Sequence, residues 1–109
     1  MQGERLKILK EWIAENPEDP FNWYSLALEY RKTDREEALG LFLKIQKEHP
    51  GYVPTYYPLA QMWMEVEQWD QALQVVEEGI RHASEQSKTK ISQELNGLKR
   101  QIEDEMLLD

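Results

Sequence analysis

The residues of this sequence that could do chemistry are two histidines and several short acidic runs. His49 and His82 are each expected near a helix end, and neither belongs to an HExxH motif or to another spaced set of metal ligands. The helix dipole alone favours a histidine at the C-terminal end of a helix. The runs EEAL, EVE and EDE lack the turn glycine of a calcium loop. Because cysteine, a phosphate loop and GxSxG are also absent, we expect no catalytic residue, no metal, no cofactor and no enzyme activity.

A second feature is aromatic. The stretch YYPLAQMWMEVEQWDQAL, residues 56–73, holds two tyrosines, two tryptophans and two methionines but no Lys or Arg. Such a cluster can form a ligand pocket, a partner surface or plain core. The spacing decides between these, because side chains three and four residues apart share one helix face.

Length and composition favour one small domain. The chain has 109 residues, of which 40% are apolar and 31% are charged. The start, MQGERLKILKEW, has no apolar region of a signal peptide, and no apolar run is long enough to span a bilayer. A cytoplasmic location without membrane contact is therefore expected.

The charge is acidic. The net charge of −8 argues against nucleic acid, whose phosphates need Lys and Arg. No Lys or Arg lies between Lys47 and Arg81. This segment is either a solvated acidic face or a surface that attracts a basic segment of a partner. Its acidic residues are Glu48, Glu65, Glu67, Asp70, Glu77 and Glu78.

The apolar spacing predicts six helices and no strand, and hence an all-α fold. Proline-containing breaks separate several of these helices, as at NPEDP and HPG. Asp70 is predicted to cap the fifth helix. The expected helices cover Arg5–Ala14, Phe21–Tyr30, a third with Ala38, Leu39, Phe42 and Ile45, a fourth from Pro54 with Leu59, Met62, Trp63 and Val66, a fifth with Leu73, Val76 and Ile80, and a sixth from about Lys88 to Leu107.

Pro58 would lie inside a helix that begins at Pro54, where proline removes one backbone hydrogen bond. We favour a helix whose first turn is loose. The alternative is a bend that widens the surface beside Tyr57.

An internal repeat links the two halves of the chain. NPEDPFNWYSLALEY aligns with HPGYVPTYYPLAQMW at an offset of 33 residues, and EEALGLFLKI aligns with DQALQVVEEG at an offset of 34. The first repeat therefore has one residue fewer in its internal turn, where a deletion moves no packed position.

The repeat resembles the tetratricopeptide repeat over about residues 5–83. That family's signature is an aromatic, a Leu and a small residue, a second aromatic, and then Ala, an aromatic and Pro. Two features depart from it: Val76 replaces an aromatic, and no proline closes the second repeat. The matching residues are Trp23, Leu26, Ala27, Tyr30, Ala38, Phe42 and Pro50, and then Tyr56, Leu59, Ala60, Trp63 and Ala72.

The alanines of the pattern are expected where paired helices approach most closely, because a larger side chain there would overpack the contact. The aromatics would fill the space that the alanines leave. We therefore predict core positions, and no ligand pocket, for Trp23, Tyr30, Tyr56, Trp63 and Trp69.

The resemblance implies a helix-pair solenoid that binds other proteins. In this family the first helix of each repeat lines a concave groove that holds a peptide. The implied groove residues are Phe21, Tyr24, Leu28 and Arg31 in the first repeat, and Pro54, Tyr57, Gln61 and Met64 in the second. The alternative for the two tyrosines is sideways packing on a neighbouring helix.

One branch of the family grips a peptide's C-terminal carboxylate with Lys, Asn and Arg in the groove. Here tyrosine stands twice at the fifth position, and Leu28 or Gln61 stands where that branch has Asn. A carboxylate clamp is therefore not expected.

The sixth helix carries a short heptad-like stripe: Ile91, Leu95, Leu98 and Ile102. We favour a capping helix that covers the open end of the second repeat, as terminal repeats require. The alternative is a seam between two copies, which would make the chain a self-assembling structural protein.

These expectations define one domain over residues 1–109. It consists of a half-repeat helix over residues 1–16, repeats over residues 20–52 and 53–86, and a capping helix over residues 87–109. The expected partner is a protein or peptide with apolar and basic residues, bound by a monomer or a weak homodimer.

Overall fold

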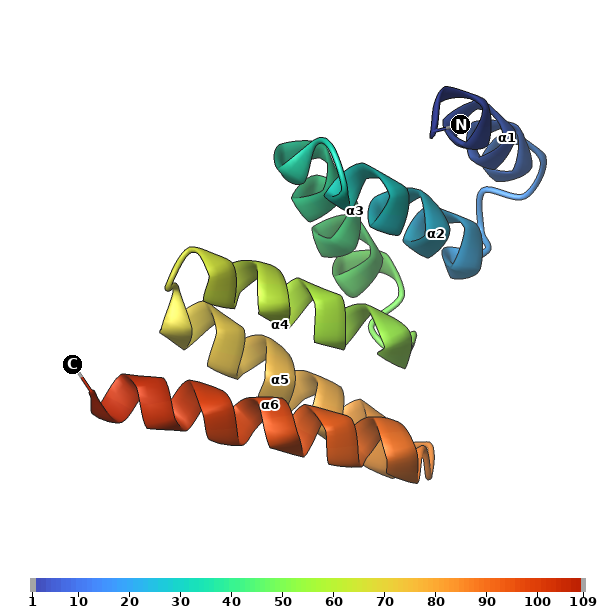
Figure 1. Ribbon diagram of the computed structural model, residues 1–109. Helices are drawn as coiled ribbons and strands as arrows, with labels where there is room; N and C mark the ends of the chain where they lie inside the picture. Colours follow the sequence, from blue (N-terminus) through green and yellow to red (C-terminus); the bar gives the residue numbers. More distant parts are fainter. Residues whose placement is uncertain (1, 109) are drawn as a thin grey trace. The chain divides into compact units, whose positions relative to one another are not determined.

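The computed structural model describes residues 2–108, and within that range all regular structure is helical (Figure 1). The prediction of an all-α fold with six α-helices is confirmed. The elements are α1 (Gln2–Glu15), α2 (Pro20–Arg31), α3 (Arg35–Glu48), the 3₁₀ turn η1 (Val53–Thr55), α4 (Tyr56–Glu65), α5 (Trp69–Glu85) and α6 (Thr89–Leu107).

The chain divides into two compact units, Met1–Tyr52 and Val53–Asp109. The first unit holds α1, α2 and α3, and the second holds η1, α4, α5 and α6. The division falls between residues 52 and 53, where one repeat of the sequence meets the next. The assignment of all 109 residues to a single domain stays a prediction.

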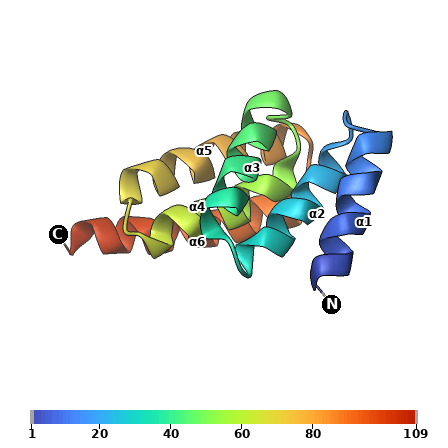
Figure 2. The same ribbon diagram turned by 90° about the horizontal axis from the view of Figure 1, so that it is seen from above.

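In the first unit, α2 packs against both α1 and α3. Figure 2 shows α1 and α2 side by side, as they also lie in Figure 1. Leu9 and Ile13 of α1 and Leu26 of α2 are buried together, because their spacing places them on the facing stripes of the two helices. Partly buried side chains complete this core: Leu6, Trp23, Tyr30 and Leu41.

Aspartates begin two of these helices. The Asp19 carboxylate accepts a hydrogen bond from the backbone N–H of Phe21 at 3.0 Å, and Pro20 follows at the first helical position. The Asp34 carboxylate accepts one from the N–H of Glu37 at 3.2 Å. Each cap satisfies a backbone donor that has no partner inside the helix.

In the second unit, α5 packs against α4 and α6, and α6 also touches α4. The buried side of α5 carries small residues, among them Ala72, Gly79 and Ala83, which let the neighbouring helices approach closely. The prediction that Asp70 caps this helix is wrong. Gln68 holds the cap position, and Asp70 lies in the first turn, where the helix dipole favours its charge.

Pro58 costs no helical hydrogen bond. The helix α4 begins at Tyr56, so Pro58 is its third residue, and the first four N–H groups of a helix have no partner within it. The preceding residues Val53–Thr55, including Pro54, form a 3₁₀ turn. This arrangement corresponds to the loose first turn that we favoured.

Of the five aromatic side chains predicted as core, only Tyr56 is fully buried. Trp23, Tyr30, Trp63 and Trp69 are each partly exposed. The Trp23 indole N–H donates to the carbonyl of Pro17 at 2.8 Å, and the Lys44 Nζ atom lies 4.9 Å from its ring centre. A tryptophan with a polar edge thus ties α2 to the preceding loop while its ring packs.

Among the described residues, no helix is long and apolar enough to cross a membrane.

Candidate partner-binding surface

One row of partly exposed side chains runs along α4. Tyr57, Gln61 and Met64 follow one another at four and three residues, so they share one face of the helix. Their neighbours Tyr56, Leu59 and Ala60 are fully buried. We call Tyr57, Gln61 and Met64 the α4 row. Pro54 lies outside it, in the 3₁₀ turn.

The corresponding residues of the first unit lie on α2. Phe21, Tyr24, Leu28 and Arg31 also share one face, and we call them the α2 row. Phe21 is 55% exposed, whereas the other three are partly buried. Arg31 at the C-terminal end is favoured by the helix dipole.

Tyr24 packs inside its own unit. Its ring meets the ring of Phe42 edge-on at 6.2 Å between centroids, and that of Tyr52 at 5.6 Å. Burial raises the pKa of the Tyr24 hydroxyl above its ordinary value, and also that of Tyr52. Sideways packing, the alternative for this tyrosine, is therefore what the structure shows, and Tyr24 also contributes to stability.

The raised pKa values of these tyrosine hydroxyls lead us to expect a loss of stability in alkali. Burial also raises the pKa of Tyr56, so folding holds all three protons beyond the pH, about 10, at which an unfolded tyrosine ionises. Their contribution is complete below that pH and is lost as the pH rises through the folded pKa values. We expect the melting temperature, followed by circular dichroism, to fall above about pH 10. The double variant Tyr24→Phe/Tyr56→Phe should fall less steeply; an equal slope would contradict the assignment.

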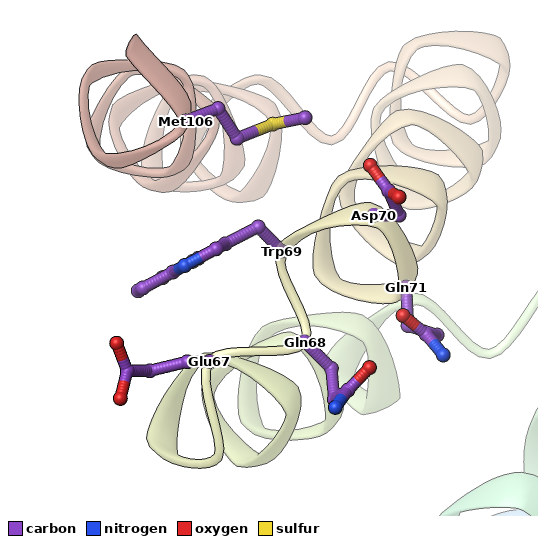
Figure 3. Close-up of a pocket in the computed structure, with 6 residues that line it drawn as sticks. All are labelled: Glu67, Gln68, Trp69, Asp70, Gln71 and Met106. Carbon is purple, nitrogen blue, oxygen red and sulfur yellow. The ribbon is translucent and has the colours of Figure 1, made fainter. Parts of the chain in front are cut away.

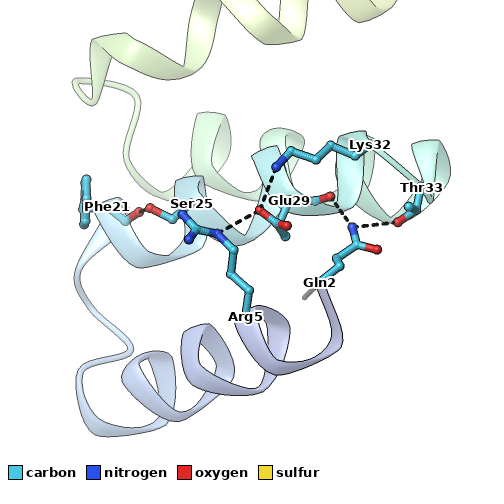
Figure 4. A network of polar contacts seen from close by, with 7 residues as sticks. All are labelled: Gln2, Arg5, Phe21, Ser25, Glu29, Lys32 and Thr33. Atoms are coloured by element: carbon cyan, nitrogen blue, oxygen red, sulfur yellow. Dashed lines mark hydrogen bonds and ion pairs between the residues drawn. The ribbon is translucent and has the colours of Figure 1, made fainter.

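A buried carboxylate ties α1 to α2 beside the α2 row (Figure 4). Glu29 is 5% exposed, and its Oε2 accepts hydrogen bonds from Arg5 at 3.0 Å and from Lys32 at 3.2 Å. The side-chain amide of Gln2 donates to the Glu29 carbonyl at 2.9 Å and to the Thr33 hydroxyl at 3.0 Å. We did not predict this cluster from the sequence. The signal for it is the repeat itself, because Met62 stands 33 residues after Glu29 and is buried too.

A small pocket lies where α4 turns into α5, beside the end of α6 (Figure 3). Glu67, Trp69 and Met106 line it, and Figure 3 shows the Trp69 side chain extending between the other two. Its volume is about 220 Å³. Small-molecule sites usually measure roughly 300–1,000 Å³, so we assign no ligand to it.

The apolar stripe of α6 is used within its own unit. Leu95 and Ile102 are fully buried, Leu98 is 3% exposed, and Ile91 is partly exposed. Because α6 packs on α5 and α4, these buried side chains have no surface left for a second copy. The capping interpretation describes this packing, and the seam between copies stays an untested alternative. Leu107 and Leu108 remain 83% and 78% exposed.

The two histidines make contacts within the fold: one caps a helix and the other stacks on an aromatic ring. His49 is the C-terminal cap of α3, and its N–H donates to the carbonyl of Ile45 at 2.7 Å. The His82 ring stacks on Tyr56 with centroids 5.9 Å apart. Within residues 2–108, no three His, Cys, Asp or Glu side chains are grouped as metal ligands.

Two glutamates of the acidic segment between Lys47 and Arg81 form ion pairs with lysines that lie outside the segment. Glu77 pairs with Lys99 of α6 at 3.5 Å, and Glu48 pairs with Lys44 at 2.8 Å. Such exposed pairs are worth little to stability. Glu67 and Asp70 are exposed beside the small pocket. Part of the segment's charge is thus balanced internally.

No family model and no curated protein matches this sequence. Solved structures do match. The solution structure of a tetratricopeptide repeat domain protein from Salinibacter ruber is 37% identical, with a TM-score of 0.77, over 82% of this chain and 91% of that one. A crystal structure of a tetratricopeptide repeat domain protein from the same organism is 35% identical, with a TM-score of 0.75, over 78% of this chain and 97% of that one.

A third similar structure is the TPR2B domain of yeast Sti1 in complex with pHsp70. It has a TM-score of 0.83 over 95% of this chain and 84% of that one, but at 20% identity it supports the fold alone. The two Salinibacter structures show more than the fold, because their sequence identity with this chain exceeds 30% and the alignment covers nearly their full length. Together with the repeat in the sequence and the helix pairs of the structure, this places the chain in the tetratricopeptide repeat family.

Proposed function

We propose that this protein is a non-catalytic interaction module that binds a peptide or protein segment through the α4 row of the second unit, and that the α2 row offers the equivalent contacts on the first unit. The helices are the scaffold, and the rows supply the contacts. The observation that carries this proposal is the α4 row: three side chains at helical spacing stay partly exposed on a helix whose other apolar residues, apart from the partly exposed Trp63, are buried.

The chemistry of the rows suits an apolar anchor. Tyr57 offers a flat aromatic face with a polar tip, Met64 an adaptable thioether, and Gln61 an amide between them. Aromatic side chains are frequent anchors at interfaces. On α2, Phe21 and Leu28 would play the apolar part and Arg31 the polar one.

The net negative charge of the protein suggests that the partner segment also carries basic residues. The protein has a net charge of −8, and Glu65 directly follows Met64. A partner segment with Lys or Arg beside its apolar anchors would associate faster at low salt. We therefore propose a segment with both apolar and basic residues, bound by a monomer or a weak homodimer. A cytoplasmic location stays a prediction from composition.

The yeast Sti1 domain supports this proposal by analogy of fold. It was solved in complex with pHsp70, so a domain of this fold can hold a partner.

The proposal predicts that truncating the α4 row weakens capture of the partner without unfolding the protein. We would immobilise the chain, expose it to an extract of its native cells and identify what is retained. The variant Tyr57→Ala/Met64→Ala should retain the same polypeptide about tenfold more weakly or worse, because anchor side chains each contribute more than about 1 kcal/mol. Its melting temperature should stay close to that of the unaltered chain, because both side chains are partly exposed.

A matched control removes equally apolar groups elsewhere. Leu43→Ala/Leu108→Ala truncates side chains that are 38% and 78% exposed outside both rows. This control should bind as the unaltered protein does. Equal binding by the row variant, or equal loss in the control, would overturn the proposed site.

A further inference from the structure

A second exposed apolar surface of the first unit lies along α1. Arg5, Ile8 and Trp12 follow one another at three and four residues, so they share one face of α1. Ile8 is 44% exposed and Trp12 is 48% exposed. Neither residue belongs to the α2 row or the α4 row.

This face of α1 continues onto α2. Phe21, Ser25 and Glu29 are four residues apart along α2, and the 3.0 Å bond from Arg5 to Glu29 joins the two faces (Figure 4). The two helices are consecutive and packed together, with only residues 16–19 between them. Trp12 and Phe21 therefore lie toward the connection, and the Arg5–Glu29 pair closes the other end. We call Ile8, Trp12 and Phe21 the α1–α2 face.

The internal repeat indicates what normally covers such a face. At the repeat offsets, Trp12 corresponds to Ile45 of α3 and to Gly79 of α5, and Ile8 corresponds to Leu41 of α3 and to Val75 of α5. Ile45 is 1% exposed, Val75 is 5% exposed, Gly79 is buried, and Leu41 is partly buried. In α3 and α5 these positions lie on helices that pack against the first helix of their own repeat, α2 and α4. On α1 the same positions are exposed, so this face has the shape of a site for a helix.

The size of Trp12 constrains that helix. At the equivalent Gly79, an added Cβ atom would lie 2.6 Å from the Cβ atom of Tyr56, so a glycine here accommodates a large aromatic residue of the first helix. On α1 the large residue, Trp12, stands at the position that the small Gly79 occupies on α5. A small residue opposite Trp12 on the covering helix would make room for the indole, as Gly79 does for Tyr56.

The charge around the α1–α2 face is acidic. Glu4, Glu11 and Glu15 lie three or four residues from Ile8 or Trp12, and all three are exposed. A second copy of this chain is a poor occupant, because each copy has a net charge of −8 and the exposed Leu107 and Leu108 follow an EDE run. A helix with basic residues along one edge complements this rim.

We propose that the α1–α2 face binds an amphipathic helix of a partner protein, which carries a small residue opposite Trp12 and Lys or Arg along the edge that faces the glutamates. The helix would pack as the first helix of a repeat does. This surface shares Phe21 with the α2 row and otherwise consists of α1 residues that belong to neither row.

The test uses a synthetic helix as probe. A fluorescein-labelled peptide of residues 18–33 carries Trp23→Ala for the small residue and Glu18→Lys and Glu29→Lys for the basic edge; a control peptide keeps both glutamates. Fluorescence anisotropy should show binding of the basic peptide to the full chain, and weaker binding of the control peptide. The protein variants Trp12→Ala and Ile8→Ala should each weaken binding about tenfold. Glu11→Lys/Glu15→Lys should weaken it as well, and Tyr57→Ala/Met64→Ala should leave it unchanged.

Several outcomes would overturn the proposal. One is the absence of binding to the unaltered chain at about 1 mM peptide. Another is unchanged affinity in Trp12→Ala or, should that variant not fold, in Ile8→Ala. A third is loss of binding only in the α4-row variant, which would place the peptide on the rows. A dimer of the unaltered chain that Trp12→Ala dissolves would make a second copy the occupant.

Discussion

Replacing Gly79 by alanine is expected to destabilise the protein by about 1–3 kcal/mol. The substitution would ordinarily stabilise a helix interior, because glycine costs roughly 1 kcal/mol there relative to alanine. At Gly79 the new methyl group would lie 2.6 Å from the Cβ atom and 2.7 Å from the Cγ atom of Tyr56, and 3.0 Å from a methyl group of Leu95. Tyr56 is fully buried, and its Cβ atom is fixed to the backbone of α4, so α4 or α5 has to shift. Urea unfolding followed by circular dichroism measures the loss.

Two other glycines are matched controls. Gly40 of α3 and Gly97 of α6 have no atom within 4 Å of an added Cβ. Gly40→Ala and Gly97→Ala should each stabilise the protein by about 0.5–1 kcal/mol. If all three substitutions shifted stability in the same direction, the close contact between α4 and α5 would be refuted.

Ala60→Leu and Ala72→Leu are each expected to destabilise by about 1–3 kcal/mol. Both alanines are fully buried, one on α4 and the other on α5, and these two helices pack together. The larger side chain has no space to enter without moving a helix. The shift in the midpoint of urea unfolding gives the size of the effect.

Ala14→Leu is the control for these variants, because Ala14 is exposed on α1 and leucine is nearly as good a helix former. It should change stability by less than about 0.5 kcal/mol. Neutral results at both Ala60 and Ala72 would mean that the repeat alignment is out of register.

Local chemistry made most of the fold predictable from the sequence. Apolar residues at three and four residue spacing and breaks at Pro17 and Pro50 are signals that act within one helix. The caps Asp19 and Asp34 were not predicted. The repeat alignment then identified the alanines and Tyr56 as buried. Where a boundary depends on only one or two residues, prediction failed: Gln68 caps α5 in place of Asp70.

The details that depend on side chains from other helices were not predictable in this way. The α6 stripe looks the same in a sequence whether it meets its own unit or a second copy, and its packing on α5 and α4 appears only in the structure. Tyr24 shares its repeat position with Tyr57, yet Phe42 and Tyr52 hold its ring. In the sequence, Glu29 has the pattern of an exposed charge, and its contacts with Arg5 and Lys32 appear only in the structure.

The most direct test of the proposed function is to map where the captured partner binds. The segment retained from native extract would be added to the isotopically labelled protein, and the backbone amide signals would be followed by nuclear magnetic resonance. We expect the largest shifts at Tyr57, Gln61 and Met64, with further shifts on α2 near Leu28. Shifts confined to the exposed side of α6, with the α4 row unmoved, would contradict the account.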